Sequence, residues 1–175
     1  MANKANQVLG MIKRNVRSRS KEVILKLYKG LVRPLLEYSI QAWRPFKKGD
    51  IKLLERVQKR ATKLVEGLRN KSYEERLIEL KLPSLEDRRT RGDMIMTYKM
   101  LNGLERVQTN RLWTYNSNSI TRGHSKKLKK TNCRLDVRKY AFGNRVTDGW
   151  NRLREDVVTS TSLNGFKNAY DESRS

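Results

Sequence analysis

Residues 51–68, IKLLERVQKRATKLVEGL, hold the clearest periodic pattern in the chain. Apolar residues recur there at steps of three and four, which places them on one face of an α-helix. They are Ile51, Leu54, Val57, Ala61, Leu64, Val65 and Leu68. A second set with the same spacing is cationic and comprises Arg56, Lys59, Arg60 and Lys63. One face is suited to packing, and the other to water or to phosphate.

The segment before this helix predicts a helical hairpin from Leu36 to Leu68. Its first arm reads LEYSIQAWRPF (36–46), and KKGD separates it from the second arm. Tyr38 and Trp43 are expected to pack against the second arm. Asp50 is expected to be the N-cap of that arm, because an aspartate side chain accepts hydrogen bonds from the free N–H groups of a first turn.

Proline and serine mark element boundaries on both sides of the hairpin. Pro34 predicts an irregularity near Gly30, because proline lacks an N–H and its ring collides with the preceding turn. Ser72, followed three residues later by a glutamate, spells a capping box. Ser84 and Asp87 predict the start of the next helix. That helix is expected to expose its arginines, which are Arg88, Arg89 and Arg91.

Three segments follow from these patterns. Residues 1–103 predict a thumb-like helical domain, residues 104–136 a basic, turn-rich connector with room for a short strand pair, and residues 137–175 a C-terminal helical segment. The last segment is expected to be helical from about Val137 to Leu153, with a final helix capped by Ser162. The predicted fold class is mainly α: a helical hairpin or bundle, then an irregular basic segment and C-terminal helices.

The charge of the chain is extreme for its length. A net charge of +22 over 175 residues favours polyanionic partners, with nucleic acid before an anionic membrane surface. Solubility alone needs a net charge of only about 2–8. The lone Cys133 excludes a disulfide framework, and no apolar run reaches the roughly 20 residues of a membrane span. The sequence therefore predicts an intracellular, nuclear protein without a membrane partner.

A basic loop is the second candidate contact with nucleic acid. It contains Arg122, Lys126, Lys127, Lys129 and Lys130. Such a run is also typical of a disordered basic loop or of a nuclear-localisation patch. These alternatives are compatible with phosphate binding that has no base specificity. For the helix face at Arg56–Lys63, the competing interpretation is a solvated surface.

Aromatic and metal-binding residues offer weaker signals. Trp113 and Tyr115 lie in a polar stretch and are candidates for base stacking, whereas Trp43 and Trp150 lie within apolar patterns that predict core packing. His124 and Cys133 cannot supply the four ligands of a structural zinc site. We expect His124 to be a polar loop residue and Cys133 a small buried group, with no metal and no cofactor.

Signatures of catalysis are missing from the sequence. It has no glycine-rich phosphate loop, no nucleophile elbow and no His-Glu-x-x-His motif. We therefore do not expect the isolated chain to be an enzyme.

Several runs, taken in order, point to a family. They are LVRPLLEYSIQAWRPFKKGDIKLLERVQKRATKLVEGL (31–68), SYEERLIELKLPSLEDRRTRGDMIMTYKMLNG (72–103), RGHSKKLKK (122–130), CRLDVRKYAFGNRV (133–146), the pair Trp150-Asn151 and SLNGFK (162–167). These runs resemble the thumb and C-terminal region of LINE-type (non-LTR) retrotransposon reverse transcriptases. The resemblance spans nearly the whole chain and implies a piece without the endonuclease, fingers and palm.

The resemblance implies binding rather than chemistry. In that family, palm aspartates that include two adjacent Asp hold the polymerase metals, and this sequence has no Asp-Asp pair. The implied role is to grip RNA, DNA or their hybrid through basic helix faces. Two alternatives stay open. The chain is an assembly module that packs on a polymerase palm or another protein, or it is part of a longer RNA-directed DNA polymerase.

Overall fold

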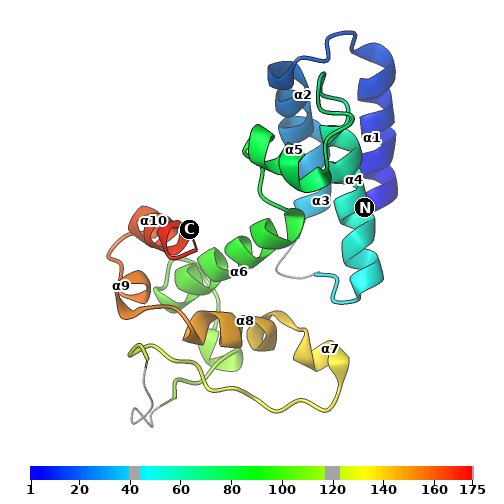
Figure 1. The fold of residues 1–175 in the computed structure, drawn as a ribbon. Coiled ribbons are helices and arrows are strands. Elements are labelled where there is room, and N and C mark those ends of the chain that lie inside the picture. The colour runs from blue at the N-terminus through cyan, green and yellow to red at the C-terminus, as the bar shows by residue number, and fades with distance from the viewer. Residues whose placement is uncertain (40–43, 117–122, 175) are drawn as a thin grey trace. The chain divides into compact units, whose positions relative to one another are not determined.

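Two hydrophobic cores divide the chain. The computed structural model describes residues 1–39, 44–116 and 123–174. It is mainly helical (Figure 1), which confirms the predicted fold class. One compact unit comprises Met1–Arg89 and the other Thr90–Ser175. The division based on contacts thus falls at Arg89, while the divisions expected from the sequence follow residues 103 and 136.

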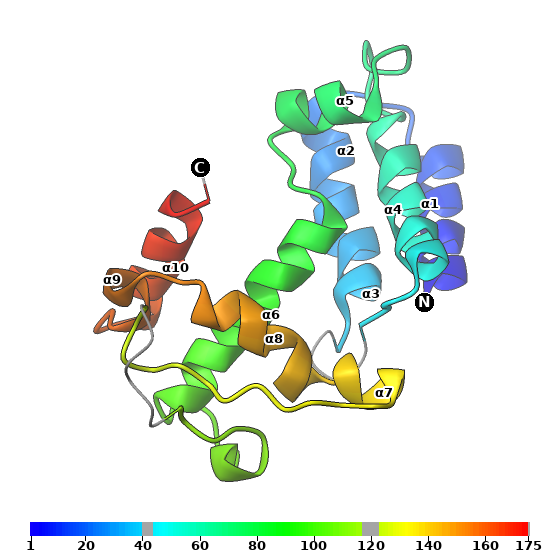
Figure 2. The same ribbon diagram turned by 60° about the horizontal axis from the view of Figure 1, so that its bottom comes forward.

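The first unit is a helical bundle around the predicted amphipathic helix. Its elements are α1 (Ala2–Asn15), α2 (Lys21–Leu27), the π-helical η1 (Tyr28–Val32), α3 (Arg33–Glu37), α4 (Lys48–Thr62), α5 (Tyr73–Leu80) and the beginning of α6 (Leu85–Leu101). Helices α1 and α4 lie side by side in both views (Figures 1 and 2). The core between the helices includes Ala5, Leu9, Ile12, Tyr28, Val32, Leu36, Leu54, Val57, Ala61, Val65 and Leu68.

Helix α4 confirms the predicted apolar face, but it begins and ends at other residues than expected. Leu54, Val57 and Ala61 are buried. The helix begins at Lys48 after an extended Lys47, so Asp50 lies in its first turn and is not its N-cap. At its other end the helix stops at Thr62, and the residues that follow form turns that keep Val65 and Leu68 in the core.

The predicted first arm of the hairpin is wrong. Helix α3 ends at Glu37, Tyr38 turns to extended angles, and Ser39 has a φ of +55°. Tyr38 is 69% exposed, so it is not the core residue that the hairpin predicted. Pro45 helps to explain the difference, because a residue before proline is disfavoured in helical conformation. Among the described residues, α4 packs against α1 and α5, and Trp43 lies outside them.

An irregularity does occur at Gly30–Pro34. The N–H of Arg33 donates to the carbonyl of Tyr28, five residues earlier, so the chain is wound as a π-helix there. Pro34 cannot donate the next α-helical hydrogen bond, and a wider turn accommodates its ring.

Serine caps appear where the sequence places them. The Ser72 Oγ accepts from the Glu75 N–H at 3.2 Å, and the Glu75 carboxylate accepts from the Ser72 N–H at 2.6 Å, which completes the capping box. Ser84 caps α6 through the Asp87 N–H at 3.0 Å. Ser162 caps α10 (Leu163–Glu172) through Gly165.

The exposure of Arg89 is a further correction. Its side chain is 2% exposed, and its Nη2 donates to the Leu36 carbonyl at 3.0 Å. Burial lowers the pKa of the Arg89 guanidinium. The end of α3 leaves that carbonyl without a helical partner, so a buried arginine satisfies a group that would otherwise cost stability.

The second unit is built around aromatic rings. The rest of α6, the 3₁₀ turn η2 (Thr109–Arg111), α7 (Asp136–Lys139), α8 (Phe142–Asn151), α9 (Glu155–Val158) and α10 form it. The Tyr98 ring stacks on Phe166 with centroids 4.4 Å apart, and Trp150 lies 6.0 Å from Phe166. In place of the single helix expected from Val137 to Leu153, an extended Ala141 separates α7 from α8.

Two further features of this unit concern the predicted connector. Among the described residues of this connector, the expected strand pair is reduced to one antiparallel bridge, between Tyr115 and Leu128. In the part of the chain that the structure describes, no helix has the length and apolar character needed to cross a bilayer.

Candidate nucleic-acid interface

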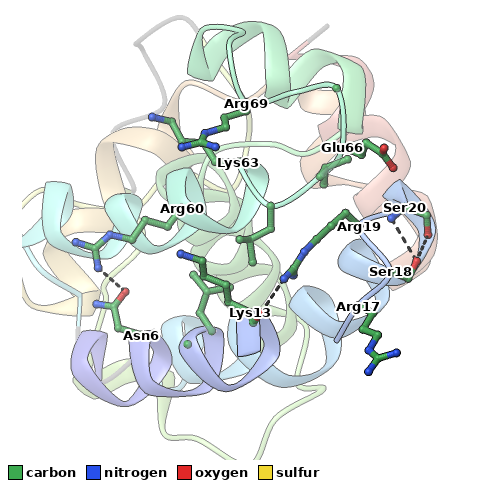
Figure 3. Close-up of a pocket in the computed structure, with 15 residues that line it drawn as sticks. Asn6, Lys13, Arg17, Ser18, Arg19, Ser20, Arg60, Lys63, Glu66 and Arg69 are labelled. Carbon is green, nitrogen blue, oxygen red and sulfur yellow. Dashed lines mark hydrogen bonds between the residues drawn. The ribbon is translucent and has the colours of Figure 1, made fainter. Parts of the chain in front are cut away.

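A basic pocket lies within the first unit, between α1, the linker that follows it, and the end of α4 (Figure 3). Its volume is about 930 Å³. Most of its lining residues have polar or charged side chains, and the full set is Asn6, Leu9, Gly10, Lys13, Arg17, Ser18, Arg19, Ser20, Arg60, Lys63, Leu64, Val65, Glu66, Gly67 and Arg69. Six of these side chains are cationic, and Glu66 is the single acid. We call the six the pocket cations: Lys13, Arg17, Arg19, Arg60, Lys63 and Arg69.

Backbone bonds hold the walls of the basic pocket. The Glu66 N–H donates to the Arg19 carbonyl at 2.9 Å, which ties the linker after α1 to the turns after α4. Gly67 has a φ of +76°, a left-handed conformation that favours glycine and lets the chain reverse after α4. The pocket therefore depends on the way in which α4 ends.

Two of the pocket cations are fixed by neutral oxygens. The Arg19 Nη2 donates to the Lys13 carbonyl at 2.6 Å, and the Arg60 Nη1 donates to the Asn6 Oδ1 at 3.0 Å (Figure 3). Neither contact neutralises a charge. Figure 3 also shows that the Arg17 side chain points away at the edge.

The pocket cations have no acidic partners within the described ranges. None of them makes a salt bridge there, although acids do pair with other cations of the first unit. Lys26 pairs with Glu22 and Lys71 with Glu79, for example. Like charges held together without counter-charges repel one another, and an anion removes that repulsion. The basic pocket therefore gathers positive charge that the described residues leave without a counter-charge.

The predicted cationic face of α4 divides into two groups. Arg60 and Lys63 line the basic pocket. Lys59 instead lies over the Tyr73 ring, with its Nζ 4.7 Å from the centroid. Arg56 is exposed and does not line the pocket. The structure thus brings two of the four residues together with cations from other segments.

Four pocket cations were not expected from the sequence: Lys13, Arg17, Arg19 and Arg69. The run RNVRSRS (14–20) contains two of them and reads only as an interruption between helices. Its alternation of arginine with serine is a usable signal, because small residues leave the long cationic side chains room to converge.

The second predicted contact, the basic loop, is held to the core of the second unit. The Trp150 Nε1 donates to the Lys126 carbonyl at 2.9 Å, and the Asn151 side chain exchanges two hydrogen bonds with the backbone of Leu128, at 2.8 and 2.9 Å. Gly123 has a φ of +131°, and the Lys127 side chain occupies the space of a Cβ there. The loop is therefore ordered from Gly123 to Lys130.

The lysines of this loop differ in their partners. Lys126 donates to the Asn102 Oδ1 at 3.2 Å, and Lys130 pairs with Asp148 at 2.8 Å. Lys127 is half-buried and Lys129 is exposed. Arg122 lies outside the described residues. The loop thus carries less uncompensated charge than the basic pocket.

The aromatic residues of the second unit differ in their exposure. Trp113 is 7% exposed, and its Nε1 donates to the Gly143 carbonyl at 2.7 Å, so its ring packs in the core in place of forming the expected stacking platform. Tyr115 is 55% exposed. Trp150 is fully buried, which confirms its predicted packing role.

His124 and Cys133 also differ from expectation. His124 is 4% exposed, and its Nε2 lies 2.9 Å from the Trp150 carbonyl, so it is a core residue and not a polar loop residue. Cys133 is half-buried, with the Asn144 Nδ2 3.1 Å from its sulfur. Among residues 1–39, 44–116 and 123–174, no group of three or more His, Cys, Asp or Glu is placed to hold a metal ion.

Comparisons with known proteins add no further candidate for the function: no protein-family model, curated protein or solved structure matches the chain.

Proposed function

We propose that the chain is a non-catalytic nucleic-acid-binding fragment similar to the thumb and C-terminal region of a LINE-type reverse transcriptase. It holds RNA, DNA or their hybrid through the basic pocket and the adjoining face of α4. The observation that carries this proposal is the convergence of six cations on one pocket without acidic partners among the described residues.

Counterion release supplies the binding energy in this proposal. Each phosphate that a lysine or arginine neutralises frees condensed counterions, so affinity falls as salt rises. Arginine side chains add paired hydrogen bonds to phosphate oxygens. Contacts of this kind position a strand but do not read its bases. Low sequence preference follows.

The basic loop of the second unit has a secondary role. Lys129 is exposed, whereas Lys130 is paired with Asp148 and Lys126 is partly engaged by Asn102. An exposed ion pair contributes little to stability and exchanges readily for phosphate. The loop therefore adds affinity at low salt but does not define the site.

The proposal includes no catalytic step, because the adjacent aspartates that hold metals in the resembled family do not occur in this sequence. A nuclear location is part of the same proposal.

Equilibrium binding at several salt concentrations tests the proposal. Labelled single-stranded DNA, single-stranded RNA, duplex DNA and an RNA–DNA hybrid of equal length are titrated with the protein at about 50–200 mM salt. We expect binding to all four, with a logarithm of the affinity that falls linearly with the logarithm of the salt concentration. Absence of binding at the lowest salt, or affinity independent of salt, would contradict the proposal.

The alternative is an assembly module, and one observation favours it. Leu135 and Val137, at the start of α7, are 72% and 80% exposed. Exposed apolar side chains gain free energy when a partner covers them. Association with a separately produced polymerase palm that is independent of salt, and is lost in Leu135→Ser/Val137→Ser, would support this alternative. An in-frame upstream sequence with an Asp-Asp-bearing palm would instead support membership of a longer polymerase.

A further inference from the structure

We propose that the basic pocket is a specific site for a compact group of adjacent phosphates, such as a free oligophosphate or the phosphorylated end of a strand. This inference rests on the proposed function and narrows it, because a general grip along a backbone needs no pocket. The argument uses the size of the pocket, one buried guanidinium nitrogen and the placement of the charges.

The basic pocket is much larger than a single phosphate needs. At about 930 Å³ it falls at the upper end of ligand sites, which are typically about 300–1,000 Å³. One phosphate fills a small part of such a volume and reaches few of the pocket cations. A strand end or a free oligophosphate can enter.

Arg19 supplies a hydrogen-bond donor inside the pocket. Its Nη2 is used by the Lys13 carbonyl, but its Nη1 is buried and has no hydrogen-bond partner among the described residues. A buried N–H of a charged group without an acceptor is costly, and such groups are rare in native proteins. A phosphate oxygen is the matching acceptor, because it carries charge and accepts from guanidinium groups.

The other cations are placed to hold further phosphates. Asn6 fixes the direction of Arg60, and Lys63 and Arg69 extend from the same side of the pocket (Figure 3). The Glu66 carboxylate points away from these three side chains in the same view. Long exposed cationic side chains can turn toward an entering anion and open the path to the Arg19 Nη1. Charges from three separate segments thus surround one volume.

Calorimetric titration of the full chain with inorganic tripolyphosphate tests the site. We expect saturable binding to one site. In Arg60→Gln/Lys63→Gln the affinity should fall at least about tenfold, because two charge-assisted contacts are lost. Arg19→Lys keeps the positive charge but replaces the forked guanidinium with a single ammonium group. Its affinity for tripolyphosphate should therefore fall several-fold, with an unchanged circular dichroism spectrum. If Arg19→Lys lowers stability, Arg60→Gln/Lys63→Gln still tests the site, because both of these side chains are exposed.

Matched controls separate site binding from net charge. Lys26→Gln/Lys71→Gln also removes two positive charges from the first unit, but both lysines lie outside the pocket and are paired with glutamates. We expect tripolyphosphate affinity within about twofold of the wild type for this control, because exposed paired charges contribute little. Equal losses of tripolyphosphate affinity in the two double variants, or no loss in either, would refute the proposed phosphate site.

Short oligonucleotides then identify the source of the phosphates. Strands with a 5′-hydroxyl, a 5′-monophosphate and a 5′-triphosphate are compared in the wild type and in Arg19→Lys. If terminal phosphates raise the affinity of the wild type and Arg19→Lys removes that increase, the site binds strand ends. If tripolyphosphate binds but terminal phosphates do not raise the affinity, the site binds a free oligophosphate. Salt-dependent oligonucleotide binding without tripolyphosphate binding refutes the inference and leaves the proposed function intact. The reverse result refutes the proposed function and leaves the phosphate site.

Discussion

Asn6→Asp is expected to change stability and anion binding in opposite directions. The substitution preserves the size of the side chain and keeps the acceptor oxygen that lies 3.0 Å from the Arg60 Nη1. It converts a hydrogen bond from a charged guanidinium to a neutral amide oxygen into an exposed ion pair, which should stabilise the first unit by about 0.2–1 kcal/mol. At roughly 6 Å from a bound phosphate, with an effective dielectric constant of about 20–80, the new carboxylate repels the anion by about 0.7–2.8 kcal/mol. We therefore expect affinity to fall by about 3- to 100-fold.

Two measurements on the same protein check this prediction. Urea unfolding reports stability, and titration with tripolyphosphate or single-stranded DNA reports affinity. Gln7→Glu is the matched control, because Gln7 is exposed on the same helix and does not line the basic pocket. The reasoning is refuted if Asn6→Asp binds anions as tightly as the wild type, or if Gln7→Glu weakens binding as much.

Three other predictions concern stability. Ser72→Ala removes the cap of α5 and should lower the free energy of unfolding by about 1 kcal/mol in urea. Tyr28→Phe deprives the buried Gln58 of a hydrogen-bond donor and should cost about 1–3 kcal/mol in the same assay. Arg91 holds the pKa of Asp171 below its usual value through two hydrogen bonds, so this contribution is present above a pH of about 4 and is lost as pH falls through the lowered pKa. Thermal unfolding of Asp171→Asn should therefore depend less on acid pH, and an unchanged profile would exclude the pair as a source of stability.

Local chemistry explains which parts of the fold were predictable. The caps at Ser72 and Ser162 depend on a side chain and a backbone N–H three residues apart, so the sequence contains both partners. The irregularity before Pro34 is equally local. Arg89 shows what local sequence cannot predict. Nothing in its neighbours in the sequence indicates that the carbonyl at the end of α3 would accept its hydrogen bond and bury it.

For the same reason, only two of the six pocket cations were predictable from the sequence. Arg60 and Lys63 belong to a periodic helix and could be named from their spacing. Arg17 and Arg19 come from an irregular linker, and only the packing of α1 on α4 and the backbone bond from Glu66 bring them to the same pocket. For Trp113 the sequence predicted too much exposure. Its neighbours in the sequence are polar, but its ring is buried against residues that are distant in the sequence.

The salt dependence of single-stranded DNA binding tests the central claim most directly. It is measured for the wild type, for Arg60→Gln/Lys63→Gln and for the control Lys26→Gln/Lys71→Gln. If the basic pocket holds the strand, the slope of the logarithm of affinity against the logarithm of salt concentration should become shallower by about 1.4 in the first variant, because two phosphate contacts are lost. The control should keep the slope of the wild type. Equal slopes in all three proteins would contradict the claim that this pocket is where nucleic acid binds.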